Sequence, residues 1–115
     1  MKLVQTRRLL QNEFDREDLP GCLTLVLRSV IELLSMPGND FAWSHWENVR
    51  AAVVDIEMLI EEIEKGHIPE NDKVGILFAP TSDIQEVSIS SGWGDVFLKV
   101  AEKYDEIETL VWPLG

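Results

Sequence analysis

The chain has 115 residues, of which 45% are hydrophobic and 27% are charged. That length and composition are typical of one folded domain with one core, and they argue against wholesale disorder. The formal net charge is −11, which repels nucleic-acid phosphates and anionic membranes and so argues against direct binding to either.

Residues 1–18 do not resemble a secretion signal. They carry four basic and four acidic side chains, and the mostly apolar stretch 22–26 that follows is far too short to cross a bilayer. The single Cys22 has no partner for an internal disulfide, and its apolar neighbours predict a buried thiol. We therefore expect a cytoplasmic protein with a single domain, 1–115, in which residues 1–17 form a flexible or peripheral N-terminal arm.

The first long helix is expected over residues 19–35. Asp18 can cap it, and Pro20 lies in its first turn, where a missing N–H does no harm. Apolar residues surround this helix almost completely, which is typical of a helix in the middle of a bundle. These residues are Leu23, Leu25, Val26, Leu27, Val30, Ile31, Leu33 and Leu34. Pro37 and Gly38 then predict its end.

A second long helix is expected over residues 45–65. Ser44 and Glu47 have the spacing of a capping box, in which the serine accepts from the third helical N–H and the glutamate reaches back. Apolar residues then recur at spacings of three and four, at Trp46, Val49, Val53, Ile56, Ile60 and Ile63. Gly66 provides a stop in the left-handed conformation.

The segment 73–90 is compatible with two structures. Val87 and Ile89 alternate with polar residues as a strand would, whereas Ser82 and Gln85 match a helix capping box. An isolated two-stranded hairpin is only marginally stable, so short helices are favoured and the hairpin remains the alternative.

A last long helix is expected over residues 95–111. Its apolar residues also recur at spacings of three and four, at Phe97, Val100, Tyr104, Ile107 and Val111. The predicted fold class is therefore all-α, a small bundle of about four to six helices. A β-hairpin in 73–90 would make the fold α+β instead.

No arrangement of catalytic or metal-binding residues stands out in the chain. His45 and His67 are its only histidines, and the helix between them would hold them ~30 Å apart at ~1.5 Å per residue. A cysteine pair, a histidine–glutamate metal motif and a phosphate-binding glycine loop are all missing from the sequence. We therefore predict no catalytic, cofactor or metal site, although Asp83 and Glu86 are the carboxylates that a small enzyme would use.

Acidic residues gather on the second long helix. Residues 44–72 carry eight acidic and two basic side chains. Glu57 and Glu61 are like charges one turn apart, and Glu61 and Glu64 lie near the negative end of the helix dipole. Each clash costs only a few tenths of a kcal/mol, but all act in the same direction. Local rules that are broken together often mark a functional surface.

Apolar and aromatic residues supply further candidates for contact with a partner. Val54 and Met58 lie one turn apart on the side opposite the buried stripe, so we expect another helix, the N-terminal arm or a partner to cover them. Trp43 and Trp93 lie near acidic residues, the second of them close to Asp95, and such aromatics suit an interface with a basic protein.

Three functions remain open from the sequence. The first is a non-catalytic interaction or regulatory protein, such as an inhibitor or immunity-type protein, that binds a basic protein by charge-steered association. The second is a structural homo-oligomer, for example a homodimer, and the third is a small enzyme with a carboxylate-lined site. The candidate contact residues are Glu57, Glu61, Glu64, Val54, Met58, Trp43, Trp93 and Asp95.

Overall fold

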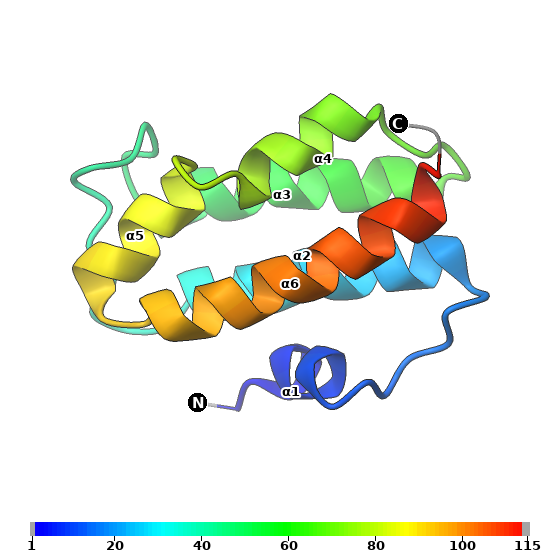
Figure 1. Ribbon diagram of the computed structural model, residues 1–115. Helices are drawn as coiled ribbons and strands as arrows, with labels where there is room; N and C mark the ends of the chain where they lie inside the picture. The colour runs from blue at the N-terminus through cyan, green and yellow to red at the C-terminus, as the bar shows by residue number, and fades with distance from the viewer. Residues whose placement is uncertain (1, 114–115) are drawn as a thin grey trace.

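The computed structural model describes residues 2–113, and every regular element in that range is a helix. The helices are α1 (Val4–Leu10), α2 (Leu19–Leu34), α3 (Val49–Glu64), α4 (Asn71–Phe78), α5 (Asp83–Ser91) and α6 (Gly94–Val111). The prediction of a small all-α bundle is confirmed, and α2 and α6 follow their expected ranges closely (Figure 1).

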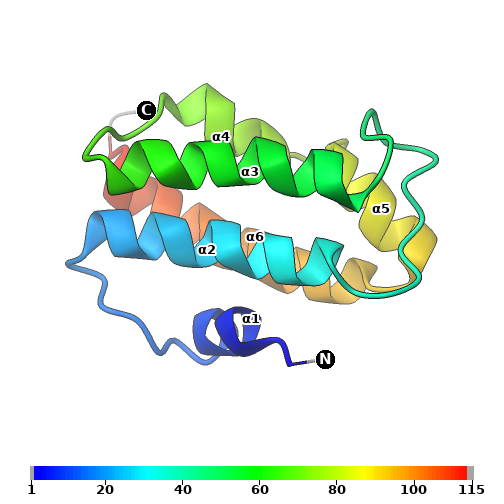
Figure 2. The same cartoon turned by 180° about the vertical axis from the view of Figure 1, so that it is seen from behind.

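The central helix of the bundle is α2. It packs against α1, α3 and α6, and α3 and α6 both run antiparallel to it (Figure 1). Seen from behind, α3 and α1 lie on opposite sides of α2 (Figure 2). Buried residues therefore cover most of α2, as its nearly continuous apolar surface predicts, but on its remaining face Arg28 is exposed and Thr24, Ile31 and Glu32 are only partly buried.

The start of α2 matches the sequence prediction. The Asp18 carboxylate accepts a hydrogen bond from the Gly21 N–H at 3.0 Å, and Pro20 lies in the first turn. Cys22 is buried just beyond, and its thiol donates to the Asp15 carbonyl at 3.1 Å. Burial raises the pKa of this thiol, so it stays protonated at neutral pH.

The expected N-terminal arm contains α1, which is tied to α2 by a carboxylate. Glu32 of α2 accepts hydrogen bonds from the backbone N–H groups of Gln5 and Thr6, both at 2.8 Å. These are free donors in the first turn of α1, so a side chain from another helix supplies the missing cap. Leu9 is fully buried and completes the contact.

The predicted capping box at the start of α3 is wrong. The helix begins at Val49, and Asn48 caps it by accepting a hydrogen bond from the Ala51 N–H at 3.0 Å. The Ser44 hydroxyl instead accepts from the Trp46 N–H within the preceding loop. The chain cannot turn into a helix at residue 45, because contacts of His45 and Trp46 with other elements hold this stretch in the loop.

The segment 73–90 forms helices α4 and α5 rather than a hairpin. The Ser82 hydroxyl accepts from the Gln85 N–H at 3.1 Å, as the capping-box spacing predicts. The α5 side chains that become buried follow a helical spacing, and Gly92 ends the helix in the left-handed conformation at φ 87°. In α4, Phe78 stacks on Tyr104 of α6 with ring centroids 4.2 Å apart.

Candidate functional site

A groove of about 670 Å³ lies between α3 and α4. The two helices run alongside each other (Figure 1), but α4 makes its main contacts with α5 and α6. The groove is open because the side chains of α4 are drawn toward α6 rather than packed against α3. We call it the α3–α4 groove, and its main lining residues are Trp46, Asp55, Met58, Leu59, Glu62, Lys73, Ile76, Leu77 and Asp83.

Two large apolar side chains stand on the edges of this groove. Met58 of α3 is 62% exposed, and Ile76 of α4 is 68% exposed. Leu59 and Leu77 lie deeper and pack against the core. The groove thus has an apolar floor and apolar edges, which is typical of a surface that receives another apolar side chain.

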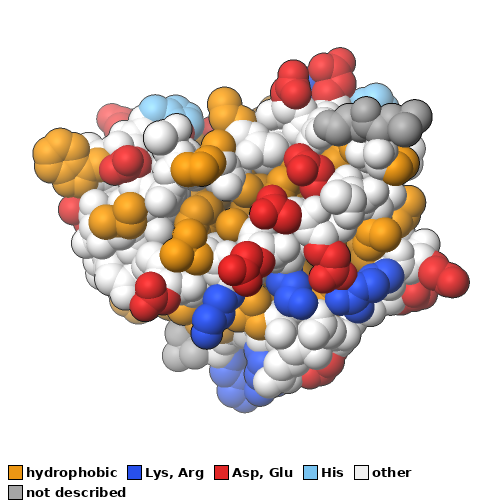
Figure 3. Space-filling view, in the orientation of Figure 1, with side chains coloured by type: hydrophobic (Ala, Val, Ile, Leu, Met, Phe, Trp, Pro, Cys, Tyr) orange, Lys and Arg blue, Asp and Glu red, His pale blue; other side chains and the backbone are white. Residues whose placement is uncertain are grey.

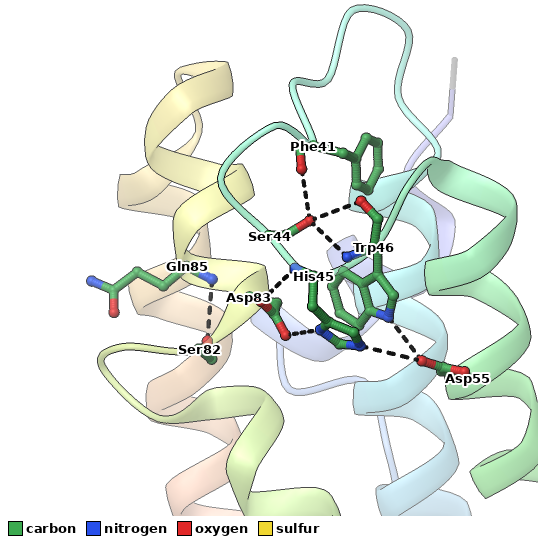
Figure 4. Close-up of polar contacts among 8 residues, drawn as sticks. All are labelled: Phe41, Ser44, His45, Trp46, Asp55, Ser82, Asp83 and Gln85. Atoms are coloured by element: carbon green, nitrogen blue, oxygen red, sulfur yellow. Dashed lines mark hydrogen bonds and ion pairs between the residues drawn. The ribbon is translucent and has the colours of Figure 1, made fainter.

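One end of the groove is closed by a polar cluster that joins the loop before α3 to α3 and α5 (Figure 4). The His45 N–H donates to Asp83 at 3.0 Å, and the ring nitrogen Nδ1 of His45 also contacts the Asp83 carboxylate. On the other side, Asp55 accepts from the Trp46 indole N–H at 2.8 Å and lies 3.8 Å from Nε2 of His45. Four side chains from three parts of the chain therefore fix this end of the groove.

Carboxylates outnumber cations along the groove. The carboxylates of Asp55, Glu62 and Asp83 line it. Within the described part of the chain, its lining residues include one lysine, Lys73, and no arginine. Oε2 of Glu62 is buried and makes no hydrogen bond within residues 2–113. Nε2 of the exposed His67 lies 3.5 Å from this oxygen. The groove is therefore anionic and has an acceptor that is not satisfied.

A second depression lies on the other side of Met58, between α3 and α2. Val54, Glu57, Glu61 and Glu64 of α3 line it together with Met58. In sequence these are the five predicted contact residues of this helix, and the structure brings them onto one solvent-facing surface. We call this set the α3 outer face.

The acidic residues of the α3 outer face differ in their partners. Glu64 forms an ion pair with Arg28 of α2 at 2.8 Å, a tertiary contact that the sequence did not reveal. Glu57 and Glu61 are exposed and form no ion pair with any cation among the described residues. The unfavourable charge predicted for this helix is therefore concentrated on Glu57 and Glu61.

The remaining predicted contact residues lie apart from α3. Trp43 is 73% exposed in the loop before α3. Trp93 is buried, and its indole N–H donates to the Asn39 side chain at 2.8 Å, so it holds the loop and offers no surface to a partner. Asp95 lies in the first turn of α6, where a carboxylate interacts favourably with the helix dipole.

The face of the molecule shown in Figure 3 has a different charge pattern. Acidic and basic side chains alternate over α6, and hydrophobic side chains gather over α5. Glu106 forms ion pairs with Arg16 and Lys103, and the pair with Arg16 lowers the pKa of Glu106. Glu106 of α6 therefore has cationic partners that Glu57 and Glu61 of α3 do not have within residues 2–113.

Sequence reasoning missed the side chains that complete the α3–α4 groove. Ile76 lies in the segment 73–90, for which the sequence predicts only local structure, and the pairing of His45 with Asp83 joins residues 38 positions apart. Asp83, a carboxylate proposed for a small enzyme, does line the groove, whereas Glu86 is not among the groove residues. A local sequence pattern cannot predict a contact between residues as far apart along the chain as His45 and Asp83.

Other kinds of site were also sought in the described part of the chain. No three histidine, cysteine, aspartate or glutamate side chains within residues 2–113 are arranged to hold a metal ion. None of the helices α1 to α6 combines the length and the apolar character that crossing a bilayer requires. Comparisons with known protein families, with curated proteins and with solved structures found no match for this chain.

Proposed function

We propose that the chain is a non-catalytic interaction or regulatory protein that binds a basic protein, as inhibitors and immunity-type proteins do. One observation carries the proposal: on the α3 outer face, the unpaired Glu57 and Glu61 lie beside the exposed Met58 and Val54. Exposed apolar side chains next to unpaired charges of one sign are suited to a partner with the opposite charge.

The energetics of α3 support this function. Glu57 and Glu61 repel each other at i and i+4, which costs a few tenths of a kcal/mol, and Glu61 also lies near the negative helix end. Lysine or arginine side chains of a partner would relieve both costs on binding. The net charge of −11 would in addition accelerate the encounter with a basic protein at low ionic strength.

The compartment proposed for this interaction is the cytoplasm. The single Cys22 is buried, and its raised pKa keeps the thiol protonated and inert. A lone, protected thiol is compatible with a reducing compartment, in which disulfides do not persist.

The test is capture of a partner from native lysate, followed by kinetics with the purified partner. We expect the association rate to fall about tenfold or more between low and high salt, because screening removes the electrostatic steering. Glu57→Gln combined with Glu61→Gln should slow association at low salt. The matched control, Glu102→Gln with Asp105→Gln, changes the net charge equally but lies on exposed positions of α6.

Two results would contradict the proposed function. One is a partner whose association rate does not depend on salt. The other is an equal effect of the α3 and α6 double variants, since net charge alone would then explain the binding. A homodimer through Val54 and Met58, both of which are exposed rather than covered, is the alternative, and a monomeric mass in solution removes it.

A further inference from the structure

We propose that the α3–α4 groove binds an amphipathic helical segment of the basic partner, which places an apolar side chain between Met58 and Ile76 and a lysine or arginine beside Glu62. This inference rests on the proposed function, and it adds the site of contact and the kind of segment that binds there.

The dimensions of the groove fit a short helix. α4 contains eight residues, which at ~1.5 Å per residue gives a wall ~12 Å long. The wall formed by α3 is longer, since that helix contains 16 residues. A helical segment of two to three turns can therefore lie along both walls, in the manner of helices that bind in grooves between other helices.

The apolar edges of the groove indicate what such a helix presents. Met58 and Ile76 come from different helices, and both are more than half exposed. An apolar side chain that lies between them would remove apolar surface of both residues from water. Met58 is also unbranched, and it can adjust to the shape of the side chain that it contacts.

The charges that line the groove indicate which charge the bound helix carries next to its apolar side chain. Among the charged lining residues, the three carboxylates outnumber the single Lys73. Asp55 and Asp83 already accept hydrogen bonds from Trp46 and His45, whereas Oε2 of Glu62 is buried without a hydrogen bond in the described chain, with Nε2 of the exposed His67 3.5 Å away. A buried acceptor without a donor is costly, and a lysine or arginine of the ligand would satisfy it.

The probe is an amidated peptide of leucine and lysine whose leucines lie on one face of a helix. The control peptide carries glutamate in place of each lysine. Titration calorimetry measures affinity, and the NMR signals of the Trp46 indole N–H and the Ile76 methyl groups report the place of binding. Ile76→Lys is the test variant, and Ile89→Lys on α5 is its control, because Ile89 is 62% exposed.

We expect the lysine peptide to bind and to shift the Trp46 and Ile76 signals, while the glutamate peptide does not bind. Ile76→Lys should weaken binding about tenfold or more, since it replaces an apolar contact with a like charge. Ile89→Lys should leave affinity within about twofold. Glu62→Gln should weaken binding severalfold and leave thermal stability unchanged or raised, which separates loss of the charge from loss of the fold.

Several results would overturn the inference. They are no binding of the lysine peptide, equal losses for Ile76→Lys and Ile89→Lys, and NMR shifts that leave Trp46 and Ile76 unmoved. A dimeric wild type that becomes monomeric in Ile76→Lys would show that a second copy occupies the groove, which also contradicts it.

The proposed function can stand when this inference fails. A captured basic partner whose binding depends on Glu57 and Glu61 but not on Ile76 would retain the function and reject the groove. Peptide binding in the groove without any salt-dependent partner would retain the groove and reject the function. The two sets of variants therefore distinguish the two failures.

Discussion

Glu32 shows how much one side chain can determine in this fold. It is one of two charged residues in the mostly apolar helix α2, the other being Arg28. Its carboxylate accepts from two backbone N–H groups of α1 and from the Thr6 hydroxyl, at 3.0 Å for the last. The Ser29 hydroxyl in turn donates to Thr6 at 2.9 Å. The Glu32 carboxylate is thus the hydrogen-bond acceptor that joins α1 to α2.

The first prediction concerns this residue. Glu32→Ala should lower the free energy of unfolding by roughly 1–3 kcal/mol, because it leaves partly buried donors without an acceptor. Urea denaturation measures the loss, and hydrogen exchange should show that the Gln5 and Thr6 amides lose protection first. Glu13→Ala removes the same charge from an exposed position and serves as the control. Equal stability of the two variants would contradict the role given to Glu32.

At the scale of elements, the start of α3 illustrates competition between local and tertiary contacts. The sequence around Ser44 satisfies a helix-capping pattern, yet the helix starts four residues later than expected, at Val49. Contacts of His45 with Asp83 and of Trp46 with Asp55 hold the chain in a loop before it. The same contacts close one end of the α3–α4 groove, so the late start of α3 is part of how the groove is formed.

The second prediction tests which residues cap α3. Asn48→Ala should reduce the free energy of unfolding by ~1 kcal/mol, the usual cost of a lost side-chain cap. Glu47→Ala removes the glutamate of the predicted capping box, and we expect a change within ~0.5 kcal/mol, as for most exposed positions. Thermal and urea denaturation of both variants provide the measurement. A larger loss of stability for Glu47→Ala than for Asn48→Ala would contradict the Asn48 cap and support the predicted capping box instead.

At the scale of the whole molecule, charge is distributed unevenly between two faces. Glu106 of α6 forms ion pairs with Arg16 and Lys103. The α3 outer face and the α3–α4 groove have few cations, and the exposed Glu57 and Glu61 have none as ion-pair partners in the described chain. Part of the excess charge of −11 is therefore without an ion-pair partner, within residues 2–113, on the side proposed to meet a basic protein.

The third prediction follows from this excess. Raising NaCl from low concentration to ~0.5 M should increase the melting temperature, because screening weakens repulsion among the carboxylates. Each kcal/mol gained corresponds to roughly 4 °C for a domain of this size. Glu57→Gln with Glu61→Gln should melt at a higher temperature in low salt and gain less from added salt. A flat or falling melting temperature in the wild type would contradict this account.

Part of the candidate site could be predicted from the sequence. Glu57, Glu61, Val54 and Met58 lie on one helix, so helical spacing alone places them on one surface. Ile76 lies on a different helix, and its position opposite Met58 depends on the packing of α4 against α6. Spacing along the chain gives no information about such a pairing, and the α3–α4 groove was not foreseen for that reason.

The sequence by itself determined the elements that depend on local chemistry. These are the long helices with their apolar repeats, the Asp18 and Ser82 caps, and the left-handed stop at Gly66, because each relies on residues within a few positions of one another.

Only the tertiary structure decided the features that join distant residues: the Glu32 cap on α1, the late start of α3 and the opening between α3 and α4. In each of them, burial or hydrogen bonding with another element outweighs a local preference. Those tertiary contacts form only once the helices are packed.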